Sequence, residues 1–332
     1  MTPRNRIIPI FVPHAGCPNM CVFCDQKRIS GSLFPASGQT VTETLAPLPD
    51  GAGYELAFYG GSFTAIPASR QEELLSAAQP ARARGAIRAI RVSTRPDAVD
   101  AETTERLRRW GVETVELGAQ SMSDAVLSAS GRGHTAGDTC RAAALLKDAG
   151  FKVILQMMTG LPGSSPELDL FTAREIIALA PDGVRIYPTV IIRGTRLEEM
   201  WRSGEYREHT VEDAVRLCAD ILPLFERAGI SVIRLGLNPS DELSGGEAVA
   251  GAYHPALGEL VRSEILRRRA EQLLTGVKPG SSAVILVPQN RLSAMIGRHR
   301  CNVTALERAF SLKKLAVSGA DVDDIQLQIL SE

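Results

Sequence analysis

Three cysteines near the start of the chain are the residues best suited to chemistry. They lie in the string Cys17-Pro-Asn-Met-Cys21-Val-Phe-Cys24. Thiolates bind iron and zinc alike, so the spacing alone does not select the metal. One loop with this spacing can hold three of the four irons of a cubane cluster and leave the fourth iron open. A structural zinc site needs four closed ligands, and the nearest further candidate is His14.

The other three cysteines, Cys140, Cys218 and Cys301, are scattered through segments that look helical. This distribution is not typical of a disulfide framework. In a reducing compartment, single cysteines in helices are usually small buried apolar residues. We therefore assign these three to packing and the clustered three to metal or cluster ligation.

The elements that must position the cysteines follow a βα rhythm up to about residue 236. We expect parallel strands at Ile7–Val12, Leu56–Tyr59, Ile90–Ser93, Thr114–Leu117, Val153–Met157 and Val184–Tyr187, with Ser231–Leu235 as a seventh or edge strand. We expect helices at Ala68–Arg84, Ala101–Trp110, Gly137–Ala149, Pro166–Leu179 and Val211–Ala228. The predicted fold class is α/β, a partial (β/α)6 barrel of parallel strands followed by a small C-terminal α/β unit.

The loops that follow the predicted strands hold the unusual residues of the chain. The cysteines follow the first strand, and Gly60-Gly61-Ser62-Phe63-Thr64 follows the second. Thr94-Arg95-Pro96-Asp97 and Gly118-Ala119-Gln120-Ser121 follow the third and fourth. Because the carboxyl ends of parallel strands meet at one edge, these loops predict an active site at that rim.

Residues 237–332 lack this rhythm and predict a second unit, beginning with a loop at Asn238–Gly251. Its expected elements are a basic helix at Leu257–Leu274, a strand at Ala283–Val287, a helix at Gln289–Ile296, a turn at Gly297-Arg298-His299-Arg300, a helix at Asn302–Phe310 and a strand at Lys314–Val317. The domain boundary is therefore predicted between residues 236 and 237.

The composition predicts a folded cytoplasmic protein. The chain has 332 residues, of which 44% are hydrophobic, and 37 basic residues against 38 acidic ones give a net charge of -1. Such a balance provides no global field that would attract nucleic acid, so RNA binding would need local patches. Neither a secretory signal nor an uncharged apolar run of about 20 residues is present. The oligomeric state is not indicated.

The pattern C-x-x-x-C-x-aromatic-C after a first strand resembles the signature of radical S-adenosylmethionine (SAM) enzymes. The resemblance implies a [4Fe-4S] cluster on Cys17, Cys21 and Cys24, whose open iron chelates SAM. It also implies that the reduced cluster cleaves SAM to a 5′-deoxyadenosyl radical, with an electron donor such as flavodoxin or ferredoxin as partner.

The same resemblance assigns cofactor-binding roles along the rim. The glycine-rich segment would contact the methionine amine of SAM, and Arg95 would pair with its carboxylate. The full predicted set is Phe23, Gly60, Gly61, Ser62, Thr64, Ser93, Arg95, Gln120, Gln156, Met158 and Tyr187. Met158 could equally be a core residue. In Arg132-Gly133-His134-Thr135, a helix cap at Thr135 is weighed against a catalytic His134.

Longer strings within residues 7–236 resemble the catalytic subunit of elongator. They are Phe58-Tyr-Gly-Gly-Ser-Phe-Thr64, Ser93-Thr-Arg-Pro-Asp97, Glu116-Leu-Gly-Ala-Gln-Ser121, Arg132-Gly-His-Thr135 and Tyr187-Pro-Thr-Val-Ile-Ile-Arg-Gly-Thr195. That family modifies the wobble uridine of tRNA using acetyl-coenzyme A, so the resemblance implies tRNA or another RNA as substrate. We expect no acetyltransferase domain after residue 237 and no long basic segment before the first strand. The carboxymethylation itself is therefore not transferred to this chain.

The second unit resembles a KH RNA-binding core, with Gly297-Arg298-His299-Arg300 in place of the G-x-x-G loop. Arg298 and Arg300 are the predicted RNA-binding residues, assisted by Arg262, Arg267, Arg268 and Arg269 on the preceding helix. The alternative is a small α/β unit with solvated basic faces.

The function indicated is a radical SAM enzyme that modifies tRNA or other RNA, a transferase. One alternative is a radical enzyme acting on a small-molecule metabolite. Another is a noncatalytic RNA-binding protein stabilised by a cluster or by zinc.

Overall fold

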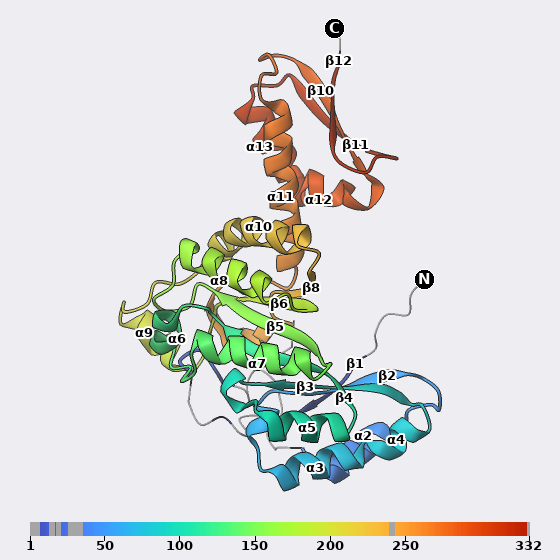
Figure 1. Ribbon diagram of the computed structural model, residues 1–332. Coiled ribbons are helices and arrows are strands. Elements are labelled where there is room, and N and C mark those ends of the chain that lie inside the picture. Colours follow the sequence, from blue (N-terminus) through green and yellow to red (C-terminus); the bar gives the residue numbers. More distant parts are fainter. Residues whose placement is uncertain (1–6, 13–16, 18–20, 26–35, 239–242, 331–332) are drawn as a thin grey trace. The chain divides into compact units, whose positions relative to one another are not determined.

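The computed structural model describes residues 7–12, 17, 21–25, 36–238 and 243–330 (Figure 1). Contacts between Cα atoms divide the chain into two compact units. The larger contains Met1–Thr210 and Ile221–Pro255, and the smaller contains Val211–Asp220 and Ala256–Glu332. Within the described residues, no helix combines the length and apolar character needed to cross a bilayer.

A seven-stranded sheet forms the centre of the larger unit (Figure 1). Its order is β1 (Ile7–Phe11), β2 (Tyr54–Tyr59), β3 (Ile87–Thr94), β4 (Val112–Gln120), β5 (Lys152–Thr159), β6 (Gly183–Pro188) and β8 (Ser231–Leu235). All six neighbouring pairs are parallel. The predicted α/β fold class, with parallel strands curled into a partial barrel, is confirmed. The predicted seventh strand, β8, is confirmed as an edge that pairs with β6.

Helices cover the outer side of this sheet. The larger unit contains α2 (Gly38–Leu45), α3 (Ala68–Ala77), α4 (Gln79–Ala83), α5 (Ala101–Arg109), α6 (Asp124–Ala129), α7 (Ala136–Asp148), α8 (Pro166–Ala178) and α9 (Arg196–Arg202). The single helix predicted at residues 68–84 is two helices. Pro80, near the start of α4, has no N–H to continue the ladder of α3. The short helices α2, α6 and α9 were not predicted.

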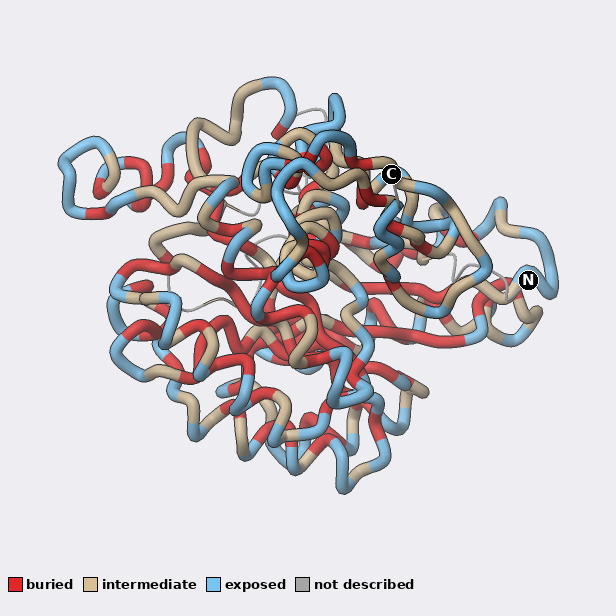
Figure 2. Tube along the Cα trace, turned by 90° about the horizontal axis from the view of Figure 1, so that it is seen from above, coloured by how far each residue is buried: buried red, intermediate tan, exposed pale blue. Residues whose placement is uncertain are grey.

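The five inner strands, β2 to β6, consist mostly of buried residues, which are red in Figure 2. Successive side chains of a strand point to opposite faces. Leu56, Ile90 and Val115 are fully buried apolar residues of one alternation. The other alternation places charged side chains, including Arg91 and Glu116, toward the inner face, where they bond across strands. The sheet therefore has an apolar outer layer under the helices and a polar inner face.

The segment predicted as a loop at Asn238–Gly251 contains a strand. β9 (Ala248–Gly251) pairs antiparallel with β7 (Val190–Ile192), and neither strand was predicted. This pairing explains why residues up to Pro255 belong to the larger unit by contacts. The domain boundary that the sequence predicts between residues 236 and 237 stays a prediction.

The smaller unit includes the first part of α10 (Val211–Arg227) and the elements after Ala256. These are α11 (Leu257–Leu274), β10 (Ser282–Pro288), α12 (Leu292–Ile296), α13 (Cys301–Ala309), β11 (Lys314–Ala320) and β12 (Gln326–Leu330). In the sheet order β11-β10-β12, β10 is parallel to β11 and antiparallel to β12. Ile285, Met295 and Leu306 belong to the core that joins sheet and helices. The predicted strand–helix–turn–helix–strand order is confirmed, and β12 is an addition.

Candidate functional site

The cysteine loop leaves the end of β1 and is tied to two other loops. Cys21 is buried, whereas Cys17 and Cys24 are half-buried. The backbone N–H of Cys24 donates to the carbonyl of Cys21 at 3.0 Å. Val22 donates its N–H to Ser130 O at 3.1 Å, and Val22 O accepts the N–H of Leu197 at 2.8 Å. These backbone bonds fix the loop between the segments that follow α6 and β7. His14, the alternative zinc ligand, lies outside the described residues.

The glycine-rich loop after β2 lies against Cys17. Gly60 has φ +88°, a conformation that glycine adopts without steric cost. Ser62 Oγ lies 2.9 Å from Thr94 Oγ1 and accepts the backbone N–H of Arg95 at 3.1 Å. Thr64 Oγ1 lies 2.5 Å from the same Thr94 hydroxyl. The loops after β2 and β3 are therefore locked together by buried hydroxyl groups.

Residues of the neighbouring loops affect the ionisation of the Cys17 thiol. Burial raises the pKa of the Cys17 thiol, and the neighbouring Cys21 raises it further. Arg132, Arg95 and the backbone N–H of Ser62 oppose this rise. Two cationic side chains and one backbone donor thus favour the thiolate, the form that ligates metals.

Arg95 is a buried ion-pair residue with one free donor. Its side chain is 3% exposed, and Nε and Nη2 each donate to the carboxylate of Asp97 at 2.8 Å. Nη1 is buried and has no partner among the described residues. Asp97 therefore aligns the guanidinium and leaves Nη1 free to donate to another acceptor.

Gln120 and Gln156 are joined at the ends of β4 and β5. Gln156 Nε2 donates to Gln120 Oε1 at 3.3 Å. Gln120 has φ +64°, and the β4–β5 register shifts between Leu117 and Gln120. A non-glycine residue in this region and a bulge are both common where a side chain is aimed at a functional site.

An apolar wall completes the rim. Phe23, Met158 and Tyr187 pack in one cluster around Val126 and Leu161. Burial raises the pKa of the Tyr187 phenol. Its hydroxyl accepts a hydrogen bond from Arg185 Nη1 at 3.5 Å. Met158 is 8% exposed and is shared between this wall and the core. Ser93 lies on the inner face of β3, in the same alternation as Arg91.

The string Arg132-Gly-His-Thr135 contacts backbone carbonyls at the end of β4. Arg132 Nη2 donates to Gly118 O at 2.6 Å, and Arg132 Nη1 lies 3.4 Å from the Cys21 sulfur. His134 Nε2 lies 3.2 Å from Ala119 O, and burial lowers the pKa of its imidazole to about 4. Thr135 forms a capping box at the start of α7. The capping interpretation of Thr135 is therefore correct, and Arg132 is a site residue that the sequence did not single out.

A polar network on the inner face of the sheet was also missed. Glu116 on β4 accepts from Arg91 at 2.6 Å, from Arg185 at 2.8 and 3.0 Å, and from Tyr59 at 3.1 Å. Arg91 also pairs with Glu55. The signal in the sequence was the presence of charged residues within several otherwise apolar strands. This network links β2, β3, β4 and β6 through buried side chains on the inner face of the sheet.

These residues fit the predicted cofactors. Three thiolates are the donor set that iron–sulfur clusters use. Three buried polar atoms near them lack partners among the described residues, namely Arg95 Nη1, Arg132 Nε and His134 Nδ1. Within those same positions, no three His, Cys, Asp or Glu side chains converge as ligands of a single metal ion would. Free donors and acceptors of this kind are what a carboxylate, an amine and a cluster require.

The predicted RNA-binding residues lie in the smaller unit. Arg298 and Arg300 are exposed and form no ion pair within the part of the chain that the structure describes. The helix cations, by contrast, are engaged. Arg267 pairs with Glu264 and Glu271, Arg268 with Asp220 and Glu264, and Arg269 with Asp324. These three arginines are therefore held by acidic neighbours, and their assistance in RNA binding stays a prediction.

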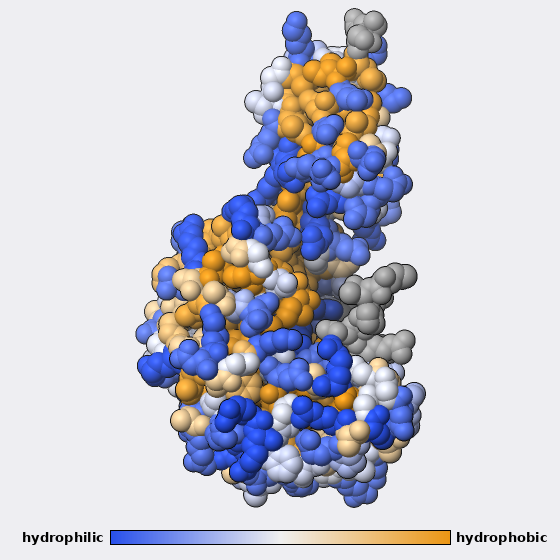
Figure 3. All heavy atoms as spheres, turned by 45° about the vertical axis from the view of Figure 1, so that its right-hand side comes forward, coloured by the Kyte–Doolittle hydropathy of each residue, from blue (hydrophilic) through white to orange (hydrophobic). Residues whose placement is uncertain are grey.

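The surface of the smaller unit is mixed in character. Figure 3 shows apolar residues gathered on one face of it, bordered by hydrophilic ones. Leu273, Ile329 and Leu330 are its exposed large apolar side chains. The unit is therefore not uniformly basic, and a role in RNA binding depends on the loop at Gly297–Arg300.

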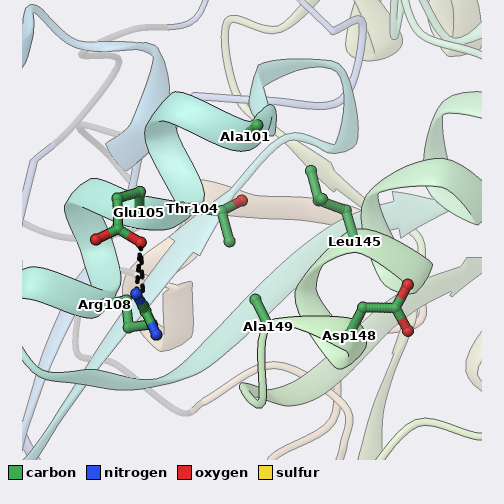
Figure 4. A pocket seen from close by; sticks show the side chains of 7 residues that line it. All are labelled: Ala101, Thr104, Glu105, Arg108, Leu145, Asp148 and Ala149. Carbon is green, nitrogen blue, oxygen red and sulfur yellow. Dashed lines mark hydrogen bonds and ion pairs between the residues drawn. The ribbon is translucent and has the colours of Figure 1, made fainter.

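A surface hollow lies elsewhere, between α5 and α7 (Figure 4). It is lined by Ala101, Thr104, Glu105, Arg108, Leu145, Asp148 and Ala149, and an ion pair joins Glu105 to Arg108. It contains none of the predicted site residues, because both helices lie on the outer layer of the sheet.

Two family models match the chain. The Radical SAM superfamily model matches residues 11–171, and the Radical_SAM C-terminal domain model matches residues 181–267. With the parallel half-barrel and the three cysteines at its rim, they define the class: the chain belongs to the radical SAM superfamily. At the level of the superfamily, the predicted [4Fe-4S] cluster and SAM are confirmed as cofactors.

Similar proteins point to one branch of this superfamily. The tRNA uridine(34) acetyltransferase of Methanocaldococcus infernus is 39% identical over 145 residues, which cover 42% of this chain and 27% of that protein. The archaeal Methanocaldococcus infernus Elp3 with N-terminus deletion is a structural match with TM-score 0.63 and 26% identity, covering 80% of this chain and 63% of that one. The radical domain of this chain therefore resembles the elongator branch, as predicted, while the matched segment spans about a quarter of the curated relative.

A more distant structure shows the fold alone. Coproporphyrinogen III oxidase (HemN) from Escherichia coli, described as a radical SAM enzyme, matches with TM-score 0.54 and 13% identity, over 93% of this chain and 80% of that one.

Proposed function

We propose that this chain reductively cleaves SAM at a [4Fe-4S] cluster and uses the resulting 5′-deoxyadenosyl radical to modify a base of tRNA. The observation that carries the proposal is the convergence of Cys17, Cys21, the Ser62 loop, Arg95 and Arg132 at one rim of the half-barrel. These groups come from four different loops. Their shared burial and electrostatic coupling is the arrangement expected of an active site.

Each group has a distinct task in this proposal. Cys17, Cys21 and Cys24 hold the cluster, and when bound it supplies the electron that cleaves SAM. Gly60 and Gly61 let the backbone approach the methionine amine. Arg95, oriented by Asp97, offers its unpartnered Nη1 to the methionine carboxylate.

Other residues of the rim bind the rest of SAM and exclude water. The side-chain amides of Gln120 and Gln156 present polar groups for the ribose or adenine. Phe23, Met158 and Tyr187 form the apolar wall against which a nucleoside can pack. An enclosed site matters because a carbon radical can abstract hydrogen from accessible C–H and S–H groups other than those of the substrate.

Transfer RNA is proposed as the substrate because the chain resembles proteins named tRNA uridine(34) acetyltransferase. The strings that carry this resemblance lie at the rim, in Phe58–Thr64, Glu116–Ser121 and Arg132–Thr135. Arg298 and Arg300 of the KH-like unit are proposed to bind phosphates. Flavodoxin or ferredoxin is proposed as the electron donor, and the cytoplasm as the location.

The test compares modified nucleosides in tRNA by mass spectrometry. Cells without the protein are complemented with wild type, with Cys24→Ala, or with Cys140→Ala as a control cysteine on α7 outside the loop. We expect one modified nucleoside to disappear without the protein, to return with wild type and Cys140→Ala, and to stay absent with Cys24→Ala. An unchanged nucleoside profile would contradict the RNA substrate and favour a small-molecule substrate. Return of the nucleoside with Cys24→Ala would contradict radical chemistry.

A further inference from the structure

We propose that Arg132 raises the reduction potential of the cluster, by placing a buried positive charge and an N–H donor against the sulfur of Cys21. Arg132 is a positioning residue, since it contacts a proposed ligand of the cluster and not the substrate. This inference rests on the proposed function, because it requires the cluster. None of the roles predicted from the sequence includes Arg132.

The geometry fixes the guanidinium between the cysteine loop and the end of β4. Nη1 donates to Cys21 Sγ over 3.4 Å, and Nη2 donates to Gly118 O over 2.6 Å. Gly118 gives this approach room, because a Cβ there would lie 3.2 Å from Nη2, a tighter contact than most Cβ atoms make. Gly131 and Gly133, on either side of Arg132, have φ +65° and +70°. Two glycine turns therefore aim this side chain inward.

The charge of Arg132 is buried, and no carboxylate among the described residues pairs with it. The residue is 7% exposed, and its Nε has no partner among the described residues. Ion pairs across the described chain include Arg91, Arg95 and Arg185 of the same barrel, but not Arg132. An unpaired buried cation is costly unless an anion adjoins it. The site therefore favours a negatively charged group beside Cys21.

A cluster held by three thiolates is such a group. Its negative charge grows by one electron on reduction, so a fixed neighbouring cation stabilises the reduced form more than the oxidised form. Hydrogen bonds to cluster sulfurs and local charge are known determinants of cluster potential. Arg95 contributes less to this effect, because the carboxylate of Asp97 offsets its charge.

The test is a redox titration of anaerobically reconstituted protein without SAM, followed by electron paramagnetic resonance. The variants are Arg132→Met, Arg132→Gln and Arg132→Lys, with Arg108→Met as a control that removes an exposed arginine from α5. Iron and sulfide content is measured for each. We expect a more negative midpoint potential for Met and Gln, a potential closer to wild type for Lys, and no shift for Arg108→Met.

Several results would overturn the inference. A fully loaded Arg132→Met or Arg132→Gln cluster with the wild-type potential would do so, as would a Lys variant shifted as far as Met. Loss of the cluster from both neutral variants would assign Arg132 to cluster retention instead. An unchanged potential with a large loss of SAM affinity would assign it to SAM binding. Absence of any cluster signal in wild type would contradict the proposed function itself. That result differs from a normal wild-type cluster whose potential does not respond to Arg132, which would contradict this inference alone.

Discussion

Glu116 on β4 and Arg185 on β6 form a two-point ion pair inside the barrel. Arg185 Nε lies 2.8 Å from Glu116 Oε2, and Arg185 Nη2 lies 3.0 Å from Glu116 Oε1. Both side chains are about nine-tenths buried, and β5 lies between the two strands in the sheet. The pair therefore links strands that share no backbone bonds, directly beneath the cofactor rim.

Neutralising Glu116 should destabilise the fold. In Glu116→Gln, the buried Arg91 and Arg185 would retain a single carboxylate partner, Glu55, which pairs with Arg91. Breaking a buried ion pair costs about 3 kcal/mol or more. The free energy of unfolding, measured by denaturant titration, should fall by that amount. Glu113→Gln, at an exposed position on the same strand, should change it by less than about 0.5 kcal/mol. Equal effects of the two variants would show that the network does not stabilise the barrel.

Gln120 and Gln156 should act as one unit in binding SAM. Each single change to alanine should weaken SAM binding about tenfold, the equivalent of roughly 1.4 kcal/mol. Because the two amides are hydrogen-bonded, the double variant should lose much less than the product of the single losses. Anaerobic calorimetry measures this, with Gln39→Ala, exposed on α2, as the control. Unchanged affinity in both single variants would exclude these residues from the SAM site.

Asp169 should make the fold less stable as the pH rises. Its carboxylate is 1% exposed and accepts from Gly160 N at 2.8 Å and Ser164 Oγ at 2.6 Å. Burial raises its pKa to about 6 from an ordinary value of 3.8. The folded state therefore binds more protons than the unfolded state between about pH 4 and pH 6, and its stability falls across that window.

The effect of Asp169 is measured against Asp169→Asn. Stability of wild type relative to this variant should decline by about 2 kcal/mol from pH 4 to pH 7, since each pKa unit corresponds to ~1.4 kcal/mol and the unfolded carboxyl is partly ionised at pH 4. Thermal unfolding at several pH values reports it. Asp148→Asn, at an exposed position on α7, should show no such trend. A difference between wild type and Asp169→Asn that is independent of pH would be inconsistent with a raised pKa.

We expect Arg300 to lower the stability of the smaller unit and to contribute to RNA binding. It has φ +61°, a region that costs a non-glycine residue roughly 1 kcal/mol. Arg300→Gly should therefore raise the stability of the smaller unit while weakening tRNA binding and lowering the salt slope by about one. Fluorescence anisotropy at several salt concentrations measures binding, with Arg308→Gly, exposed on α13, as the control. Undiminished binding by Arg300→Gly would remove this residue from the RNA surface.

Local patterning in the sequence predicted most of the fold. Buried parallel strands are near-continuous apolar runs, so β2 to β6 were recognisable from composition and spacing. The short strands β7 and β9 were not, because three or four residues carry too little periodicity and their pairing joins segments about 60 residues apart. The split between α3 and α4 had a visible signal in Pro80.

The site was predictable where a loop motif carries the chemistry and not where side chains meet across the fold. Cys17, Cys21 and Cys24 share one loop, and Ser62 and Arg95 follow recognisable strands. Arg132 contacts Cys21 across 111 positions of the chain, and no local pattern reports such a contact. The same holds for the network around Glu116, whose members come from β2, β3, β4 and β6.

The most direct test is 5′-deoxyadenosine formation by the purified, reconstituted and chemically reduced protein. With SAM alone, wild type should form it slowly, and unmodified tRNA should accelerate its formation, whereas Cys24→Ala should form none. A protein that holds a full [4Fe-4S] cluster yet releases no 5′-deoxyadenosine would contradict the account of radical chemistry. Formation that is indifferent to tRNA would contradict the proposed substrate.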